Sequence, residues 1–246
     1  MDRMIYTSMT GAKHTLEQQA TVSHNLANAT TTGFRAQLNE FRAVPVVGAP
    51  LATRAFVVDS SVGTDFRAGA IQHTGRELDV AVQGEGWLAV EAPDGSEAYT
   101  RNGSLQVDEN GVLRTANGLA VLGDGGQLSI PPGSRLAVAR DGTISLLPDG
   151  SAATGLTAIG RLKLVNPPAA ELKRGDDGLF RMNDGSTAAV DTNVNVISGA
   201  LETSNVNVVD AMVDMISLAR QFEMQMKLLQ TAESNDAKAA QLLGMS

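Results

Sequence analysis

The chain contains no cysteine, which excludes disulfides, zinc–thiolate sites, iron–sulfur clusters and cysteine nucleophiles together. Aromatic residues make up only 4% of the 246 residues, so few large side chains are available to anchor one compact core. The hydrophobic content of 43% nevertheless requires a folded part, because a disordered chain of this length would be far more polar.

Clusters of basic residues are also missing. Lys and Arg number 19 against 27 Asp and Glu, the formal net charge is −8, and no run of four or more basic residues occurs. Because binding to phosphates needs a basic surface, this balance argues against nucleic acid and against an anionic membrane surface as partners.

Long apolar runs are absent as well. None approaches the roughly 20 residues that a membrane helix needs, so no membrane insertion is expected. The residues from Met1 to Tyr6 lack the basic start, apolar stretch and small-residue cleavage site of a secretory signal. We therefore expect a chain that either stays in the cytoplasm or is exported by a route that removes nothing.

The first segment, residues 2–30, has the pattern of an amphipathic helix. A stripe at alternating steps of four and three consists of Ile5, Met9, Ala12, Leu16, Gln19, Ser23 and Leu26. The segment contains no Pro and only one Gly, Gly11, so the pattern predicts a helix with a narrow apolar face. Three threonines followed by Gly33 are typical of a helix stop.

The last segment, residues 205–244, predicts a longer helix. The same spacing is kept by Met212, Met215, Ala219, Phe222, Met226 and Leu229, and neither Gly nor Pro occurs between Gly199 and Gly244. At ~1.5 Å per residue the helix would be roughly 55–60 Å long, too long for a small domain to cover. Gln225 is expected on a more polar face of this helix.

The middle of the chain has the pattern of short strands joined by tight turns. Nine Asp-Gly or Asn-Gly pairs lie between residues 94 and 185, and the first five, at 94, 102, 110, 117 and 124, are seven or eight residues apart. Such pairs favour turns with positive φ, so we predict an antiparallel β-meander or small barrel.

The predicted fold class is α+β. Long N- and C-terminal helices pair as a coiled-coil-like assembly domain, and an antiparallel β-rich domain is inserted between them. The expected ranges are 1–33 for the N-terminal assembly helix, 34–70 for an irregular connector with Pro45 and Pro50, 71–200 for the β-rich domain and 201–246 for the C-terminal assembly helix. Since isolated helices are weak in water, apolar faces without cover in their own chain need other copies.

Several runs of sequence resemble signatures of the flagellar rod and hook proteins. Asn25–Phe34 (NLANATTTGF) is similar to the N-terminal signature of that family, and Gly199–Asn207 (GALETSNVN) is similar to the C-terminal signature before the last helix. Val82–Trp87 (VQGEGW) and Ala98–Ser104 (AYTRNGS) resemble its shared central stretches. The resemblance covers nearly the whole chain.

The opening residues 1–12 and the modest length resemble proximal-rod members more than distal-rod or hook-type subunits, which are the alternative within the family. Two departures stand out. His24 occupies a position where the family usually has another Asn, and Gln19 and Ser23 interrupt the N-terminal stripe.

The resemblance implies a structural axial subunit with neither enzymatic activity nor a cofactor. Such subunits stack helically in the periplasmic part of the flagellar basal body, around a central export channel, and form the drive shaft. Their partners are other copies of the chain and other flagellar rod proteins. They leave the cell through the flagellar type III export apparatus without a cleaved signal peptide.

The residues that we expect at the assembly interface come from the two terminal signatures and the two helix stripes. They are Ile5, Met9, Leu16, Asn25, Leu26, Asn28, Gly33, Phe34, Ser204, Asn205, Val206, Met212, Met215, Ala219, Phe222, Met226 and Leu229. Asn25 and Asn28 are three residues apart, so they can bond across one helical turn or to a neighbour's backbone, or simply end the helix. Eight of the nine methionines lie in the terminal segments, where flexible thioethers suit either core filling or contacts with non-identical neighbours.

Two alternatives from other classes deserve statement. Carboxylate pairs at 176–177 and at Glu77 with Asp79 raise the hypothesis of a peptidoglycan-acting hydrolase, although both have turn or strand surroundings. The other alternative is a cytoplasmic β-domain binding module that dimerises through a coiled coil. No metal site is expected, since the three histidines show neither HxH nor HExxH spacing.

Overall fold

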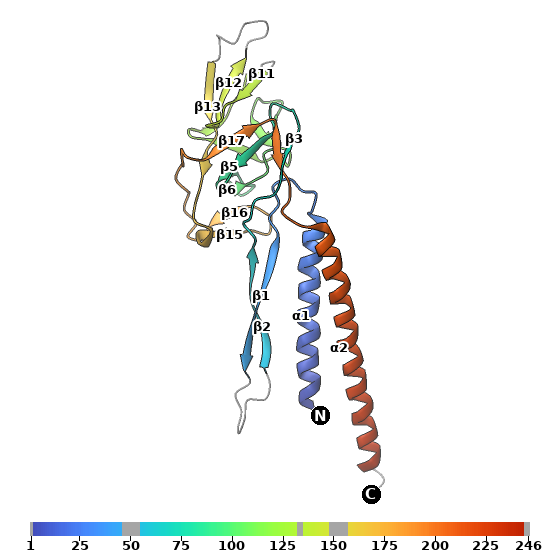
Figure 1. Cartoon of the computed structure of the whole chain (residues 1–246). Coiled ribbons are helices and arrows are strands. Elements are labelled where there is room, and N and C mark those ends of the chain that lie inside the picture. The colour runs from blue at the N-terminus through green and yellow to red at the C-terminus, as the bar shows by residue number, and fades with distance from the viewer. Residues whose placement is uncertain (1, 46–54, 132–134, 148–156, 244–246) are drawn as a thin grey trace. The chain divides into compact units, whose positions relative to one another are not determined.

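The structure is a computed structural model, and it describes residues 2–45, 55–131, 135–147 and 157–243 (Figure 1). The described residues form two compact units. The first comprises those of Met1–Ala29, Ala36–Asp65 and Val206–Ser246, and the second comprises those of Thr30–Arg35 and Phe66–Asn205. The expected turn at 149–150, Pro50 and residues 244–246 lie outside the described residues.

Two helices dominate the first unit. Helix α1 spans Asp2–Ala27 and helix α2 spans Val208–Leu243. Helix α2 is long because no Gly or Pro interrupts it, and Asn207 caps its start. The Asn207 Oδ1 atom accepts a hydrogen bond from the Val209 N–H at 3.0 Å, and its Nδ2 donates to Asp210 at 2.7 Å. Helix α1 ends at Ala27, six residues before the predicted glycine stop at Gly33.

The two helices lie side by side and run in opposite directions, with both chain ends at the same end of the pair (Figure 1). Their less exposed residues alternate at steps of three and four and define the seam. On α1 these are Ile5, Ser8, Ala12, Thr15, Gln19, Val22 and Leu26, and on α2 they are Ala211, Met215, Leu218, Phe222, Gln225, Leu229 and Ala232. The two terminal helices therefore pair with each other within a single chain, and each covers part of the apolar face of the other.

The seam differs from the predicted stripes by one residue at every second position. Met9, Leu16 and Ser23 are exposed on α1, where Ser8, Thr15 and Val22 face α2 instead. Met212 and Met226 are likewise exposed on α2. Positions one apart lie only about 100° apart around a helix, so two overlapping stripes fit the same apolar pattern. In the folded chain the stripe that packs against the partner helix is the one that includes small and polar residues such as Ser8 and Thr15.

Gln225 lies in this seam, so the expected polar position is also wrong. Its side chain faces Gly11, where a Cβ atom would collide with the Gln225 amide. The Thr15 hydroxyl donates to the Gly11 carbonyl at 3.0 Å and receives a long hydrogen bond of 3.5 Å from the Gln225 Nε2 atom. Glycine therefore lets a long polar side chain enter the seam, and its Oε1 atom is buried without a hydrogen-bond partner among the described residues.

A β-hairpin completes the first unit and packs along α1. Strand β1 spans Gln37–Pro45, strand β2 spans Ala55–Thr64, and they pair in antiparallel register. The irregular connector expected at 34–70 is therefore wrong for these two strands. Pro45 misled the prediction, because a proline at the end of a hairpin strand does not disrupt the pairing.

The second unit is built from short antiparallel strands, as predicted. The largest sheet has the order β15 (Leu172–Arg174), β16 (Phe180–Met182), β6 (Glu97–Thr100), β5 (Trp87–Glu91), β9 (Ala120–Gly123), β8 (Leu113–Thr115) and β7 (Leu105–Val107). Strand β10 (Gly126–Gln127) adds to β9, and β14 (Leu164–Val165) adds to β5. A 3₁₀ turn, η2, spans Ala169–Glu171.

Three smaller groups of strands complete the second unit. One is a three-stranded sheet of β11 (Arg135–Val138), β12 (Thr143–Leu147) and β13 (Thr157–Arg161). The other two are pairs, β17 (Asn195–Ser198) with β4 (Val80–Gln83) and β18 (Ala200–Glu202) with β3 (Ile71–His73). Strand β18 leads out of the β unit, so its partner β3 fixes the course of the chain there.

The Asp-Gly and Asn-Gly pairs form turns largely as predicted. Positive φ occurs at the glycine of six of them, namely Gly95, Gly111, Gly118, Gly142, Gly178 and Gly185. Gly103 is an exception, because it does not have positive φ and instead lies against the Val80 carbonyl, where no side chain fits. Glycine is needed at this position because the chain passes close to Val80, not because a turn is formed there.

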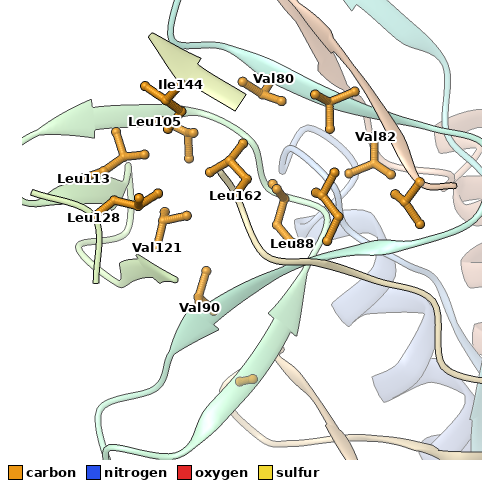
Figure 2. Packing of buried hydrophobic residues seen from close by; sticks show 14 of the residues in the cluster. Val80, Val82, Leu88, Val90, Leu105, Leu113, Val121, Leu128, Ile144 and Leu162 are labelled. Atoms are coloured by element: carbon orange, nitrogen blue, oxygen red, sulfur yellow. The ribbon is translucent and has the colours of Figure 1, made fainter. Parts of the chain in front are cut away.

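The core of the β unit is aliphatic, in keeping with the low aromatic content. Figure 2 shows Val80, Leu88, Leu105 and Leu113 converging from four different strands with Leu162, which follows β13, and all five are fully buried. Trp87, Tyr99 and Phe180 belong to a second, smaller cluster against which Phe66 packs, and the Trp87 and Phe180 rings are 4.6 Å apart. A core assembled from many short strands thus needs few large rings.

Phe222→Asp tests the helix pair. Because Phe222 is half-buried in the seam, an unpaired carboxylate there should separate the helices, and amide hydrogen exchange in α1 and α2 should become faster in the dilute monomer. Met224→Asp is the matched control, since Met224 is exposed on the same helix. Equal exchange rates in the two variants would contradict the pairing.

Candidate functional site

The signature runs converge on a buried cluster of charges inside the β unit. The Glu202 carboxylate, at the end of β18, lies between two arginines that are distant in sequence. Its Oε1 contacts Arg35 Nη1 at 2.7 Å, and its Oε2 accepts a hydrogen bond from Arg101 Nη1 at 2.9 Å. All three side chains are almost completely buried. We call these three residues the charge cluster.

Backbone groups complete the surroundings of the charge cluster. Glu202 Oε1 also accepts a hydrogen bond from the Gly69 N–H at 2.8 Å. Arg101 Nη2 donates to the Gly84 carbonyl at 2.7 Å, so the VQGEGW run supplies an acceptor to the AYTRNGS run. Buried charges need such partners, because leaving them unpaired costs several kcal/mol, of order 3–5 for a broken buried pair.

The charge cluster carries one negative and two positive charges. Burial lowers the pKa of the Arg101 guanidinium, and the neighbouring Glu202 carboxylate opposes that shift. The Trp87 ring faces both cations, with its centroid 5.3 Å from Arg101 Cζ and 6.0 Å from Arg35 Cζ. An aromatic face attracts cations, which partly compensates the excess positive charge. Among the described residues, no hydrogen-bond acceptor is found for Nε of Arg101 or for any guanidinium nitrogen of Arg35, whose Nη1 has only the ion-pair contact with Glu202.

Gly33 brings the N-terminal signature onto the charge cluster. Its φ of +68° is in the left-handed region, and its Cα faces the peptide between Arg101 and Asn102 so closely that a Cβ would collide with it. Its N–H donates to the Glu202 carbonyl at 2.8 Å. Both constraints demand glycine, so the Gly33 position joins the N-terminal and C-terminal signatures directly.

Phe34, Ser204 and Asn205 also lie within the β unit. Phe34 is buried beneath the Arg174 guanidinium, whose Cζ lies 4.6 Å from the ring centroid, and burial lowers the pKa of Arg174. The Asn205 N–H donates to the Phe34 carbonyl at 3.3 Å, and its Nδ2 donates to the Arg67 carbonyl at 3.0 Å. Ser204 is buried. These three predicted interface residues therefore have contacts within their own chain.

The two asparagines of the N-terminal signature bond locally. Asn25 holds the first residue of β1, because its Nδ2 donates to the Gln37 carbonyl at 2.8 Å and its Oδ1 accepts from the Gln37 N–H at 2.8 Å. Asn28 Nδ2 donates to the His24 carbonyl at 2.9 Å, which is a bond across one helical turn. Asn25 thus aligns the hairpin with α1, and a bond to a neighbouring copy stays a prediction.

The helix residues of the predicted interface fall into two groups. Ile5, Leu26, Met215, Ala219, Phe222 and Leu229 are half-buried, as is Val206 before α2. Met9, Leu16, Met212 and Met226 are exposed. Only the second group presents its apolar side chains mainly to the solvent in a single chain.

The residues of the charge cluster were not singled out from the sequence, although Arg101 and Glu202 lie inside the signature runs and Arg35 follows Phe34 directly. A signal was present: Glu202 alternates with Ala200 along β18, both facing inward, where a strand normally carries apolar side chains. Gly69 and Arg101, which bind the Glu202 carboxylate, lie 133 and 101 residues before it in the sequence, so no local pattern identifies them.

Two further features of the described residues bear on the site. None of the helices in the described part of the chain is long and apolar enough to cross a membrane. A search of the described side chains for three or more His, Cys, Asp or Glu in a metal-holding arrangement found no such group.

Three family models match the chain in the order that the signature runs suggest. Residues 5–35 match the flagella basal body rod protein model, residues 81–146 match the flagellar hook protein FlgE/F/G D1 domain, and residues 197–242 match the flagellar basal body rod FlgEFG protein C-terminal model. The chain therefore belongs to the flagellar basal-body rod protein family, as its resemblance to the rod and hook proteins predicted.

Within that family the similarity to individual relatives extends over complete chains. The chain is 51% identical to the flagellar basal-body rod protein FlgF of Escherichia coli and 50% identical to FlgF of Salmonella typhimurium, covering 100% of each chain in both cases. It is 30% identical to FlgG of Buchnera aphidicola, over 97% of this chain and 98% of the relative. These FlgF proteins are thus more similar to it than this FlgG is, which confirms the sequence assignment within the family.

Glu202→Gln tests the charge cluster. The amide keeps the shape but leaves two buried cations without a counter-charge, so the free energy of unfolding of the β unit should fall by about 3–5 kcal/mol in urea titration. Arg101→Met should cost less, because Arg35 and Glu202 remain as a neutral pair. Glu109→Gln, in an exposed turn, is the control. A loss for Glu202→Gln no larger than that of the control would contradict the assigned role.

Proposed function

We propose that the chain is a structural subunit of the proximal flagellar rod and that it works by association with neighbouring axial subunits. One observation carries the proposal. Most of the large hydrophobic side chains that are exposed in the described residues lie on α1 and α2. Exposed apolar area on this scale is unfavourable in water at roughly 25 cal/mol per Å², so a partner surface would stabilise it.

The helix residues that we predicted at the assembly interface have two different roles in this proposal. The half-buried residues of the seam hold α1 against α2 in the manner of a coiled coil, with knobs at steps of three and four. The exposed residues Met9, Leu16, Met212 and Met226 face outward and form the surface for other subunits. Methionine suits such contacts, because its flexible side chain adapts to neighbours of different sequence.

The chain is proposed to catalyse no reaction. Of the carboxylates that raised the hydrolase alternative, Asp177 is held by Arg181 through hydrogen bonds of 3.1 and 2.7 Å, and these bonds lower its pKa. A general acid in glycoside hydrolysis needs the opposite shift. Asp79 is buried and engaged by Arg76 at 2.7 Å and Thr74 at 2.6 Å, which supports a structural role for it as well.

The family membership supports a place in the flagellar basal body. We propose that the chain reaches the periplasm through the flagellar type III export apparatus without loss of a signal peptide. Its partners would be other copies of itself and other rod proteins. The higher identity to FlgF than to FlgG favours a proximal position over a distal-rod or hook-type one. Purified basal bodies from which this protein was absent would remove the basis of the proposal.

Met212→Asp separates assembly from folding. Met212 is 50% exposed, so the substitution should leave the melting temperature of the monomer nearly unchanged. In a rod the carboxylate would be buried against a neighbour, and incorporation into basal bodies and motility should be lost. Gln221→Asp, at an exposed position of the same helix, should be tolerated. Normal rods with Met212→Asp would show that this face of α2 is not an assembly surface.

A further inference from the structure

The β unit contains a pocket of about 360 Å³ that shares no residue with the charge cluster. Three segments form it, namely the chain after β14, the η2 turn with β16, and the chain before β17. Ligand pockets range over roughly 300–1,000 Å³, so this one has room for one or two side chains. The lining residues that matter here are Pro167, Pro168, Glu171, Met182, Val190 and Asp191, and we call the site the proline pocket.

Hydrogen bonds hold two walls of the proline pocket in place. On one wall the Ala188 N–H donates to the Tyr99 hydroxyl at 2.6 Å. Burial raises the pKa of Tyr99 to about 12, so this hydroxyl stays neutral at ordinary pH. On the opposite wall the Asn183 N–H donates to the Glu171 carbonyl at 2.8 Å. Because both walls are fixed in the single chain, little ordering of the pocket is needed when it binds a ligand.

The proline pocket combines apolar surface with negative charge. Pro167, Pro168 and Met182 supply the apolar surface, and Glu171 and Asp191 supply two carboxylates. No lysine or arginine lines the pocket. The Glu171 side chain is exposed, and no ion pair or hydrogen bond joins its carboxylate to another described residue. The chemistry of this lining matches a long side chain with an aliphatic stem and a cationic end.

The basic residues of the adjoining hairpin do not offset these carboxylates. Lys173 and Arg181 pair across β15 and β16 at positions that alternate with Met182, so they point to the opposite face of the hairpin. Arg174 is on the same face as Met182, but its guanidinium Cζ lies 4.6 Å from the centroid of the Phe34 ring.

Charges from the neighbouring segments leave the pocket region acidic. Lys163 is held by Glu97 at 2.7 Å, and the two charges cancel. Asp184, in the turn after β16, adds a further negative charge close enough to influence the Tyr99 hydroxyl. A cationic ligand is therefore favoured over an anionic one.

The chain at Val190 also offers backbone groups to a ligand. Val190 lies opposite Val165 in an isolated antiparallel bridge, and the adjacent Asp191 N–H donates to the Leu164 carbonyl at 2.9 Å. In such a pairing the N–H and C=O of Val190 point away from β14. No hydrogen bond to either group is found among the described residues. Free backbone groups of this kind can pair with an extended segment of another protein.

We propose that the proline pocket binds a lysine or arginine side chain from an extended segment of another protein, and that the backbone of this segment pairs with Val190. The aliphatic stem packs on the two prolines and Met182, and the cationic end reaches Glu171 and Asp191. The inference goes beyond the proposed function, because it assigns a binding site to the β unit and does not depend on the helix surfaces.

A peptide titration of the full-length chain tests the pocket. The probe is the capped pentapeptide acetyl-Thr-Val-Lys-Val-Thr-amide, and binding is followed by NMR of the ¹⁵N-labelled chain. We expect saturable shifts of the amides of Ala188, Val190, Asp191 and Glu171. The arginine analogue should bind with similar affinity. The norleucine analogue lacks the charge and should bind at least about threefold more weakly, and the glutamate analogue should not bind.

Matched variants and a smaller probe complete the test. Glu171→Gln should weaken binding of the lysine peptide about threefold without disturbing the fold, whereas Asp176→Asn, at an exposed carboxylate outside the pocket, should leave it unchanged. Absence of shifts at the pocket, equal binding of the lysine peptide and either the norleucine or the glutamate analogue, or equal affinity of Glu171→Gln and Asp176→Asn would overturn the proposal. Lysine amide that bound as tightly as the pentapeptide would overturn the pairing with an extended segment.

Discussion

The β unit depends on one buried carboxylate. Glu202 neutralises part of the charge on Arg35 and Arg101, and the backbone around it joins Gly33, Gly69 and Gly84 to the same point. Removing the carboxylate from water is costly, so the arrangement is stable only when all of these partners are in place together. The three distant segments that carry these residues must therefore reach their places together, because the charge cluster is stable only when all of them are present.

The helix pair also depends on a few specific contacts, but these contacts are weaker than those of the charge cluster. Its seam contains Ser8, Thr15, Gln19 and Gln225 where a strong coiled coil would have larger apolar residues. Such a seam holds its register through the fit of Gln225 against Gly11, at some cost in stability. Larger apolar side chains remain on the outside, where they are available to other subunits. The helix pair thus leaves apolar surface exposed in the single chain, as the proposed association with other subunits requires.

Most elements could be predicted from the sequence where the signal is local. The uninterrupted stretch after Gly199 gives α2, and Asp-Gly or Asn-Gly pairs give six turns with positive φ. The choice between Met9 and Ser8 as seam residues could not be predicted, because both stripes obey helical spacing and the partner helix decides. The hairpin at 37–64 was missed because Pro45 indicates irregular structure when its position at a strand end is unknown. Arg35 and Glu202 attract each other across most of the chain, and no spacing rule records that contact.

The place where the chain enters the β unit adjoins the place where it leaves. After the hairpin the chain enters the β unit at Phe66 and leaves it at Asn205, and near these two ends the Thr203 N–H donates a hydrogen bond to the Ala70 carbonyl at 2.8 Å. A domain whose two ends meet behaves as a cassette, because its length and content can change without moving the points of attachment. Enlarging, trimming or exchanging the sequence between these two points is thus a geometrically inexpensive way to diversify the β unit of such a protein while the hairpin and the terminal helices are retained.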